Sequence, residues 1–320
     1  MAQTPAAALA DALAAGPVVL DGGLSTQLEA AGHDISGDLW SAVLLRDDPD
    51  AVRAAHAAFA TAGARVAITA SYQATFDGFA AAGIDHAEAE RLMRLSVRLA
   101  REATDAAFPA GGGWVAGSVG PYGAMLANGE EYTGSYVDAA WTGRTGGGLT
   151  VAELTAWHRP RMEVLADAGA DLLACETVPA AAEAEAIVGA LDTLGVPGWL
   201  SLTTVTGPDG VARTRRGEDA AAVFALAKGV DAVVAVGVNC TDPAGLLPAI
   251  EAASAAGKPV VVYPNSGETW DGAARVWRGT PDFAASEVTA WATAGARLVG
   301  GCCRVGPAQV ASVAAALGRV

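Results

Sequence analysis

The feature that most constrains the fold of this 320-residue chain is a regular alternation of two kinds of segment. Eight short runs rich in Val, Ile and Leu lack polar alternation, which predicts strands covered on both faces. These runs are residues 17–21, 65–71, 114–120, 171–177, 198–204, 232–240, 259–265 and 297–302. The segments between them are rich in Ala, Leu, Glu and Arg and have helical length: 50–62, 87–107, 151–168, 179–194, 218–228, 243–256, 282–294 and 307–318. Eight consecutive βα units predict an α/β fold, a single (β/α)8 TIM barrel.

A short repeated phrase supports this interpretation. Ala-Gly-Ala followed by Arg or Asp occurs at 62–65, 168–171 and 294–297, where a predicted helix ends and a strand begins. Glycine in that place ends a helix and turns the chain. The alternative, a doubly wound open sheet, would carry a Gly-rich dinucleotide fingerprint after the first strand, and Asp-Gly-Gly-Leu-Ser stands there instead. No low-complexity linker divides the chain, so we expect residues 1–320 to form one domain.

Composition and charge exclude several classes of function. The net charge of −15 argues against a nucleic-acid partner, because no basic patch is available to neutralise phosphates. No uninterrupted apolar stretch is long enough to span a membrane. The Ala-rich beginning of the chain has no positive segment and is interrupted by Asp11, which argues against a signal peptide. Four cysteines in a chain of this length favour metal-binding thiols in a reducing cytoplasm over a disulfide framework. The oligomeric state, monomer or homo-oligomer, is left open.

In a barrel of this kind, the chemistry is expected at the carboxyl ends of the strands. The only lysines, Lys228 and Lys258, precede strands and therefore belong to the opposite end, which excludes a Schiff-base lysine. None of the histidines stands at a strand end, so neither a histidine metal site nor a histidine base is expected. These histidines are His33, His56, His86 and His158.

Three of the four cysteines follow strands. Cys240 ends the sixth predicted strand, and Cys302 and Cys303 end the eighth. Three thiolates at one end of a barrel suit a soft divalent metal, most plausibly Zn²⁺, with one position left for a substrate. A disulfide between the two adjacent cysteines and a purely structural metal are the alternatives. Cys175 lies within the fourth strand and is interpreted as a core residue.

A metal held by three thiolates is a poor generator of hydroxide, but it can bind a fourth thiol and remove its proton. The resulting sulfur nucleophile can attack the alkyl group of a sulfonium or quaternary ammonium donor without a general base. Aromatic faces attract such a cation. The candidate aromatic residues are Trp40, Tyr72, Tyr122 and Trp270.

With this chemistry in view, the chain resembles the homocysteine S-methyltransferases, zinc-dependent barrels that methylate homocysteine to methionine. The resemblance spans nearly the whole chain, and its most specific part pairs Val238-Asn239-Cys240 with Gly300-Gly301-Cys302-Cys303. The other matching motifs are residues 21–29, 68–74, 117–123, 175–177 and 263–268.

The resemblance implies a role for each matching residue. Cys240, Cys302 and Cys303 would be zinc ligands, and the thiolate of homocysteine would be the fourth. Glu176 and Asp21 would engage the amino end of the substrate, where an ammonium group needs an anion. A turn residue at Asp21 and a salt-bridged barrel residue at Glu176 are the structural alternatives.

Three further residues receive roles on the same basis. Asn239 and Ser71 would position the substrate, and Trp40 matches a tryptophan on the donor side in relatives that use betaine.

The donor is less constrained than the acceptor. The chain lacks room for folate and cobalamin domains and is similar to the short forms, which use S-methylmethionine and sometimes S-adenosylmethionine. Betaine as donor and a selenol as acceptor are alternatives. An apparent insertion at 137–148, and Val305-Gly306 where many members have hydroxyl residues, both fall where we expect the donor.

Two other functions are consistent with parts of the sequence. A thiol-based zinc or redox sensor would explain the adjacent cysteines but not the acidic residues at the strand ends. A barrel lyase would use Gly300-Gly301 as a phosphate-binding turn, although it would lack a lysine at the upper end.

Overall fold

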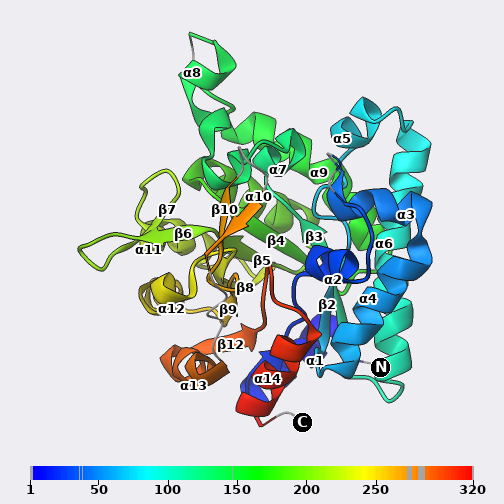
Figure 1. Ribbon diagram of the computed structural model, residues 1–320. Coiled ribbons are helices and arrows are strands. Elements are labelled where there is room, and N and C mark those ends of the chain that lie inside the picture. Colours follow the sequence, from blue (N-terminus) through cyan, green and yellow to red (C-terminus); the bar gives the residue numbers. More distant parts are fainter. Residues whose placement is uncertain are drawn as a thin grey trace.

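Every predicted apolar run overlaps a strand of one parallel sheet in the computed structural model, which describes residues 3–35, 37, 39–145, 147–271, 276–279 and 285–318. The strand order is β1-β12-β9-β8-β5-β4-β3-β2. A parallel bridge between Leu20 and Val66 and a hydrogen bond from Arg65 N to Val19 O (2.8 Å) join β1 to β2. The sheet therefore closes into the predicted barrel, with helices around it (Figure 1). The strands are β1 (Val18–Val19), β2 (Val66–Ile68), β3 (Trp114–Val119), β4 (Leu172–Val178), β5 (Gly198–Leu202), β8 (Val233–Asn239), β9 (Val260–Tyr263) and β12 (Ala296–Val299).

The predicted helices follow their strands in the expected order. They are α4 (Pro49–Thr61), α6 (His86–Ala107), α9 (Val151–Asp167), α10 (Ala181–Leu194), α11 (Ala220–Phe224), α12 (Leu246–Ser254), α13 (Ala285–Ala294) and α14 (Pro307–Ala316). The first residues of the predicted helix 282–294 lie outside the described part of the chain. Gly63, Gly169 and Gly295, from the repeated phrase, have φ values of +100°, +93° and +122°. This left-handed conformation confirms their predicted role in ending helices.

The core has two shells, which the alternation of side chains along each strand produces. Inward-facing residues such as Trp114 and Trp199 fill the barrel, and outward-facing ones such as Cys175 pack against the helices. The prediction that Cys175 is a core residue is thereby confirmed. A helix that the sequence did not predict, α1 (Pro5–Ala15), contributes Leu9 and Leu13 to the inner shell and closes the amino-terminal end of the barrel.

Short elements that the sequence analysis did not anticipate occupy the loops at the carboxyl end of the barrel. The helical ones are α2 (Leu24–Ala30), η1 (Trp40–Val43), α3 (Leu44–Asp47), α5 (Phe76–Ala81), α7 (Tyr122–Leu126), η2 (Glu130–Tyr132), η3 (Ser135–Val137) and α8 (Ala139–Thr142). Two hairpins, β6 (Thr204–Thr206) with β7 (Ala212–Thr214) and β10 (Thr269–Asp271) with β11 (Val276–Arg278), complete them. These loops build the walls of the site described below.

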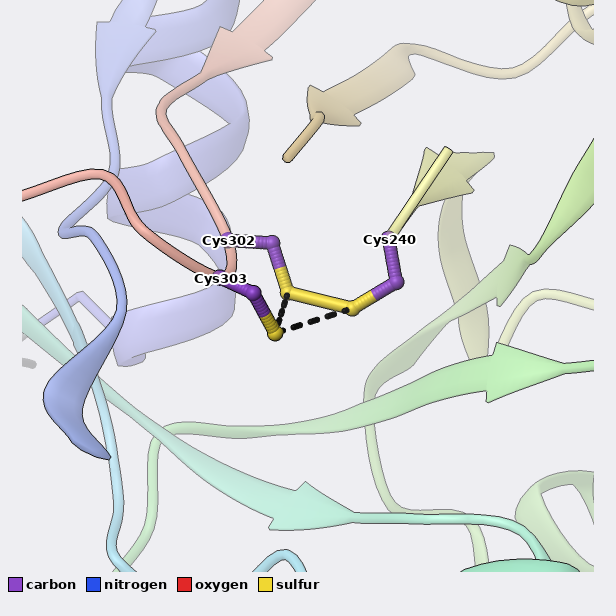
Figure 2. Close-up of side chains that lie close together, drawn as sticks. All are labelled: Cys240, Cys302 and Cys303. Carbon is purple, nitrogen blue, oxygen red and sulfur yellow. Dashed lines mark hydrogen bonds between the residues drawn. A yellow bond between two sulfur atoms is a disulfide. The ribbon is translucent and has the colours of Figure 1, made fainter. Parts of the chain in front are cut away.

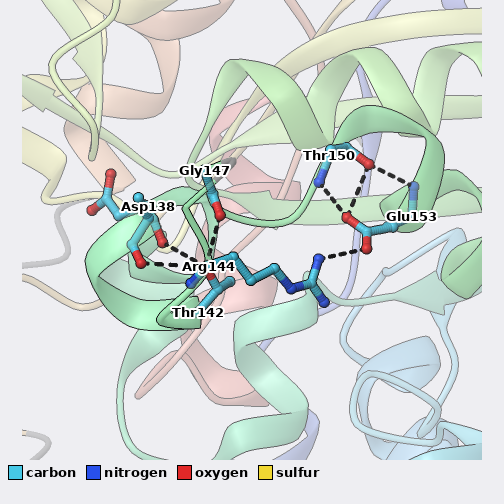
Figure 3. A network of polar contacts seen from close by, with 7 residues as sticks. Asp138, Thr142, Arg144, Gly147, Thr150 and Glu153 are labelled. Atoms are coloured by element: carbon cyan, nitrogen blue, oxygen red, sulfur yellow. Dashed lines mark hydrogen bonds and ion pairs between the residues drawn. The ribbon is translucent and has the colours of Figure 1, made fainter.

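The predicted insertion at 137–148, of which residue 146 is not described, carries α8 away from the barrel (Figure 1). The Thr142 hydroxyl donates to the Gly147 carbonyl at 2.7 Å, and Arg144 pairs with Glu153 at 2.6 Å (Figure 3). Glu153 also forms a capping box with Thr150 at the start of α9. The network therefore anchors the insertion to α9. The described residues of the insertion line neither of two cavities, introduced in the following subsections, at the carboxyl end of the barrel. Among the described residues, no helix is long and apolar enough to cross a membrane.

Candidate metal centre and active site

The three cysteines at strand ends converge on one point. Cys240 follows β8, Cys302 and Cys303 follow β12, and β9 lies between these strands in the sheet. The Cys303 sulfur lies 4.0 Å from that of Cys240 and 3.9 Å from that of Cys302 (Figure 2). A disulfide joins Cys240 to Cys302, so the covalent pair is not the adjacent pair that the sequence suggested as an alternative.

The spacing of the sulfur atoms fits a thiolate metal site. Four ligands arranged tetrahedrally with Zn–S bonds of about 2.3 Å lie about 3.8 Å apart. The two separations that involve Cys303 are close to this value. All three sulfurs lie within 4.8 Å of one another. Once the disulfide is reduced, the residues present therefore suit Zn²⁺ and leave a fourth position free.

Close backbone packing brings the cysteines together. A Cβ on Gly300 would lie 2.5 Å from the Asp21 carbonyl, and one on Gly301 would lie 2.1 Å from the Val305 side chain. Close approach therefore requires glycine at both positions. Cys240 itself has a φ of +46°, a left-handed conformation that is uncommon for residues other than glycine and concentrates at functional sites.

A cavity of about 120 Å³ lies against the cysteine cluster. We call it the first cavity. Its walls come from the loops that follow β1, β2, β3, β8 and β12 and from residues at the carboxyl ends of the strands, those of β4 and β9 among them. The residues that carry its chemistry are Trp40, Tyr72, Glu131, Tyr132, Glu176, Tyr263 and the three cysteines. Glu131, Tyr132 and Tyr263 were not among the predicted site residues. Glu176, Tyr72 and Trp40 were, and the structure brings them together beside the cysteines.

Glu176 is a buried carboxyl group at the floor of the first cavity. It accepts a hydrogen bond from the Ser118 hydroxyl and makes another with Tyr263. Burial raises the pKa of this carboxyl to about 7, although the two hydrogen bonds oppose the rise. A group that titrates near neutrality and faces a cavity is suited to receive a cation.

Asp21 lies beside Glu176, immediately behind the residues that line the cavity. One carboxylate oxygen accepts from the backbone N–H of Ile68 at 2.7 Å, and the other is buried without a partner. Burial, and then the nearby charge of Glu176, raise the pKa of Asp21 well above its usual range. Two neighbouring buried carboxyls cannot both ionise at low cost, so a positive group beside Glu176 would be strongly stabilised.

Asn239 and Ser71, the other predicted substrate-positioning residues, lie one layer behind the cavity. The Asn239 carbonyl oxygen accepts from Thr177 N and from the Ser201 hydroxyl, both at 2.7 Å, while its amide nitrogen donates to the Thr177 hydroxyl. The Ser71 hydroxyl donates to the Ser118 carbonyl at 2.8 Å. Their hydrogen bonds therefore hold the residues around Glu176 in place.

The aromatic candidates divide between the cavity and its surroundings. The Tyr132 hydroxyl makes a hydrogen bond with Cys303, so this ring adjoins the cysteine cluster. Tyr122 instead packs against Tyr136 and Trp157, away from the first cavity. The side chain of Trp270 lies outside what the structure describes.

Glu131 is the most notable residue that the sequence analysis missed. It is 5% exposed, one of its oxygens is buried without a partner, and burial raises its pKa to about 7. The available signal was a pair of glutamates followed by a tyrosine in the loop after the third strand.

Fold and site together define a (β/α)8 barrel with a cysteine-lined centre suited to a soft metal and to a thiol ligand. The sequence profile of the homocysteine S-methyltransferases matches residues 18–317, and the chain belongs to this family.

Individual relatives agree over nearly the full length. The chain is 40% identical to homocysteine S-methyltransferase YbgG of Bacillus subtilis (strain 168) over 311 residues, which cover 93% of each chain. It is 42% identical to homocysteine S-methyltransferase of Escherichia coli (strain K12), covering 93% of this chain and 94% of the relative. The metallated crystal form of the homocysteine methyltransferase MmuM from E. coli superposes with a TM-score of 0.83 at 40% identity, covering 98% of this chain and 99% of that one. The oxidised form of the same enzyme gives a TM-score of 0.82 with the same coverage.

Proposed function

We propose that this protein transfers a methyl group from a sulfonium donor, S-methylmethionine or S-adenosylmethionine, to the thiol of L-homocysteine, forming methionine. The observation that carries the proposal is the convergence of three cysteine sulfurs on a cavity that also holds a buried carboxyl group. The names of the relatives, homocysteine S-methyltransferases of two bacteria, support the acceptor. Zn²⁺ held by Cys240, Cys302 and Cys303 would supply the positive charge that lowers the pKa of the homocysteine thiol.

The residues of the chain then place the two ends of homocysteine. Its sulfur takes the position left beside the three cysteines, and its ammonium group faces Glu176, with Asp21 behind. Because burial makes the ionised form of Glu176 costly, the ammonium group supplies the charge that the protein itself lacks there. The bound substrate thus draws Glu176 into its charged form.

The methyl transfer itself requires no acid or base group from the protein. The carbon–sulfur bond of the donor breaks with its electron pair going to the donor sulfur, while a new bond forms between the methyl carbon and the homocysteine thiolate. A cation and an anion become two neutral thioethers, so no proton has to move in this step. Tyr132, beside the cysteines, offers an aromatic face to the donor cation, while Trp40 and Tyr72 line the cavity that holds homocysteine.

The disulfide between Cys240 and Cys302 gives the sensor alternative one observation in its favour. We propose instead that the working state is the reduced one, since the metal needs three thiolates, and hence that the protein acts in the reducing cytoplasm. A sensor would show no turnover with homocysteine under reducing conditions, whereas an enzyme would.

The test is methionine formation by the reduced, zinc-loaded protein from homocysteine with S-methylmethionine, S-adenosylmethionine or betaine in parallel assays. We expect methionine from at least one sulfonium donor, its loss on chelation, and its return when zinc is added back. Unchanged turnover by zinc-free protein, or no methionine from any donor, would overturn the proposal.

A further inference from the structure

A second and larger cavity, of about 730 Å³, adjoins the cysteine cluster. It shares Cys240 and Tyr132 with the first cavity, so the two meet at the point where the sulfurs converge. Its remaining walls come from the loop after β3, the β6–β7 hairpin and the segments that follow β8 and β9. In contrast to the first cavity, it carries a cationic side chain, Arg215.

Arg215 differs from most arginines of this chain. At the end of the β6–β7 hairpin, its Nε donates to the Thr203 hydroxyl at 3.1 Å, and its guanidinium carbon lies 5.4 Å from the centre of the Tyr132 ring. Among the described residues, no carboxylate lies within ion-pair distance of Arg215, although its neighbours Arg213 and Arg216 are paired with Asp209 and Asp138. Burial lowers the pKa of Arg215, which reflects the cost of leaving this charge without a partner.

The same cavity contains an unpartnered acceptor. Asn265 is 8% exposed, lines the second cavity, and has a side-chain carbonyl oxygen that is buried without a hydrogen bond among the described residues. A buried polar atom of this kind costs free energy unless a ligand or water satisfies it. The acidic residues Asp242 and Glu268 also line the wall. The cavity thus offers a guanidinium fork for an anion and acceptors for a cation.

We propose that the second cavity binds the α-amino-acid end of the methyl donor, with Arg215 holding its carboxylate and Asn265 accepting from its ammonium group. The inference rests on the proposed function, because it assigns the donor to a reaction whose acceptor lies in the first cavity. A planar guanidinium binds a carboxylate through two parallel hydrogen bonds, and Arg215 lines the second cavity, where it can offer them to a ligand. Arg215 is therefore a determinant of donor specificity.

This arrangement also places the reacting atoms. A donor anchored at Arg215 extends its sulfonium group toward Tyr132 and Cys240, the residues that both cavities share. The homocysteine sulfur lies on the first-cavity side of these residues. The methyl group is then between the two sulfurs, as displacement requires. Betaine has a carboxylate, but its only nitrogen is the quaternary one that carries the methyl groups. It has no separate ammonium group to donate hydrogen bonds, so it would use only part of this subsite.

The test compares two donors on Arg215→Met. S-methylmethionine carries the amino-acid end, and trimethylsulfonium carries only the cation. With S-methylmethionine we expect kcat/KM to fall at least about 10-fold, the effect of losing hydrogen bonds to a charged group. With trimethylsulfonium, kcat/KM should change by less than about 2-fold, and the KM for homocysteine should stay constant. Arg213→Met, in the same hairpin but outside the cavity, is the matched control.

If trimethylsulfonium turns over too slowly to measure, titration calorimetry replaces the kinetic assay. It compares the affinity of each sulfonium compound for the unsubstituted protein and for Arg215→Met, both reduced and zinc-loaded. An equal loss with both compounds, or no loss with either, would overturn the inference and leave the proposed function standing. If the unsubstituted protein forms no methionine from any donor, the proposed function itself fails.

Discussion

The buried carboxyl of Glu176 makes a quantitative prediction about stability and pH. The side chain is 6% exposed and accepts a hydrogen bond from Ser118 at the floor of the first cavity. Replacement by glutamine keeps the shape and the acceptor but removes the charge. Without substrate, the folded protein therefore no longer has to bury an anion when the pH rises.

The size and sign of the effect follow from the pKa. Burial raises the pKa of Glu176 from 4.5 to about 7 in the folded protein. The folded state therefore holds a proton that the unfolded state releases, and the stability that this proton contributes is present below pH 4.5 and lost as the pH rises toward 7. Between pH 5 and pH 8 the loss amounts to about 2.5 kcal/mol. Glu176→Gln has no carboxyl to titrate and does not lose this stability. The difference in free energy of unfolding between Glu176→Gln and the natural protein should therefore rise by about that amount from pH 5 to pH 8.

Urea unfolding of the reduced, chelator-treated proteins at several pH values measures this difference. Glu185→Gln, at an exposed position on α10, is the control and should follow the natural protein at every pH. The same Glu176→Gln protein, loaded with zinc, should show a raised KM for homocysteine, because the partner of the ammonium group is gone. Parallel stability curves for Glu176→Gln and the natural protein, within about 0.5 kcal/mol from pH 5 to pH 8, would refute a titrating buried carboxyl at this position.

Three further predictions concern the metal centre and the core. Cys303→Ser should abolish stoichiometric zinc binding, measured with a chromogenic chelator, whereas Cys175→Ala should keep one zinc per chain because Cys175 lies in the outer core. Gly301→Ala should lower both the melting temperature and the zinc content, because the added methyl would lie 2.1 Å from Val305; unchanged values in a calorimetric scan would show that the turn can relax. Burial lowers the pKa of His56 to about 4, so the stability tied to its neutral form is present above pH 6.5 and lost as the pH falls toward 4. That loss is up to about 3 kcal/mol, and acid unfolding of His56→Leu should shift to lower pH.

The barrel was predictable because the alternation of strand and helix segments is regular along the whole sequence. Each unit combines a buried run without polar alternation and a helical segment, and parallel strands with this spacing have few alternative arrangements. Helix α1 was not predicted, because its Ala-rich sequence shows little difference in polarity between its faces. Its Leu9 and Leu13 nevertheless pack into the inner core of the barrel. The β6–β7 hairpin has a recognisable turn signal in the sequence, Gly-Pro-Asp-Gly between two Thr-containing runs.

The predictable part of the site was the part fixed by topology. The ends of β8 and β12 had to meet at one end of a barrel, so three cysteines at those ends had to converge. Glu131, Tyr132 and Arg215 come from irregular loops whose paths depend on tertiary contacts. The hydrogen bond between Tyr132 and Cys303 joins residues far apart in the sequence, and no local pattern encodes it. Asn239 and Ser71 are predicted to position the substrate; in the structure their side chains bond to Thr177 and Ser118 and do not line the first cavity.

Under the proposed function, the three cysteines hold a metal with one position left for the thiol of homocysteine. X-ray absorption at the zinc edge of the reduced, zinc-loaded protein, recorded without and with homocysteine, tests it most directly. We predict three sulfur ligands at about 2.3 Å without homocysteine and four with it. An unchanged number of sulfur ligands on saturation with homocysteine would contradict this mode of binding.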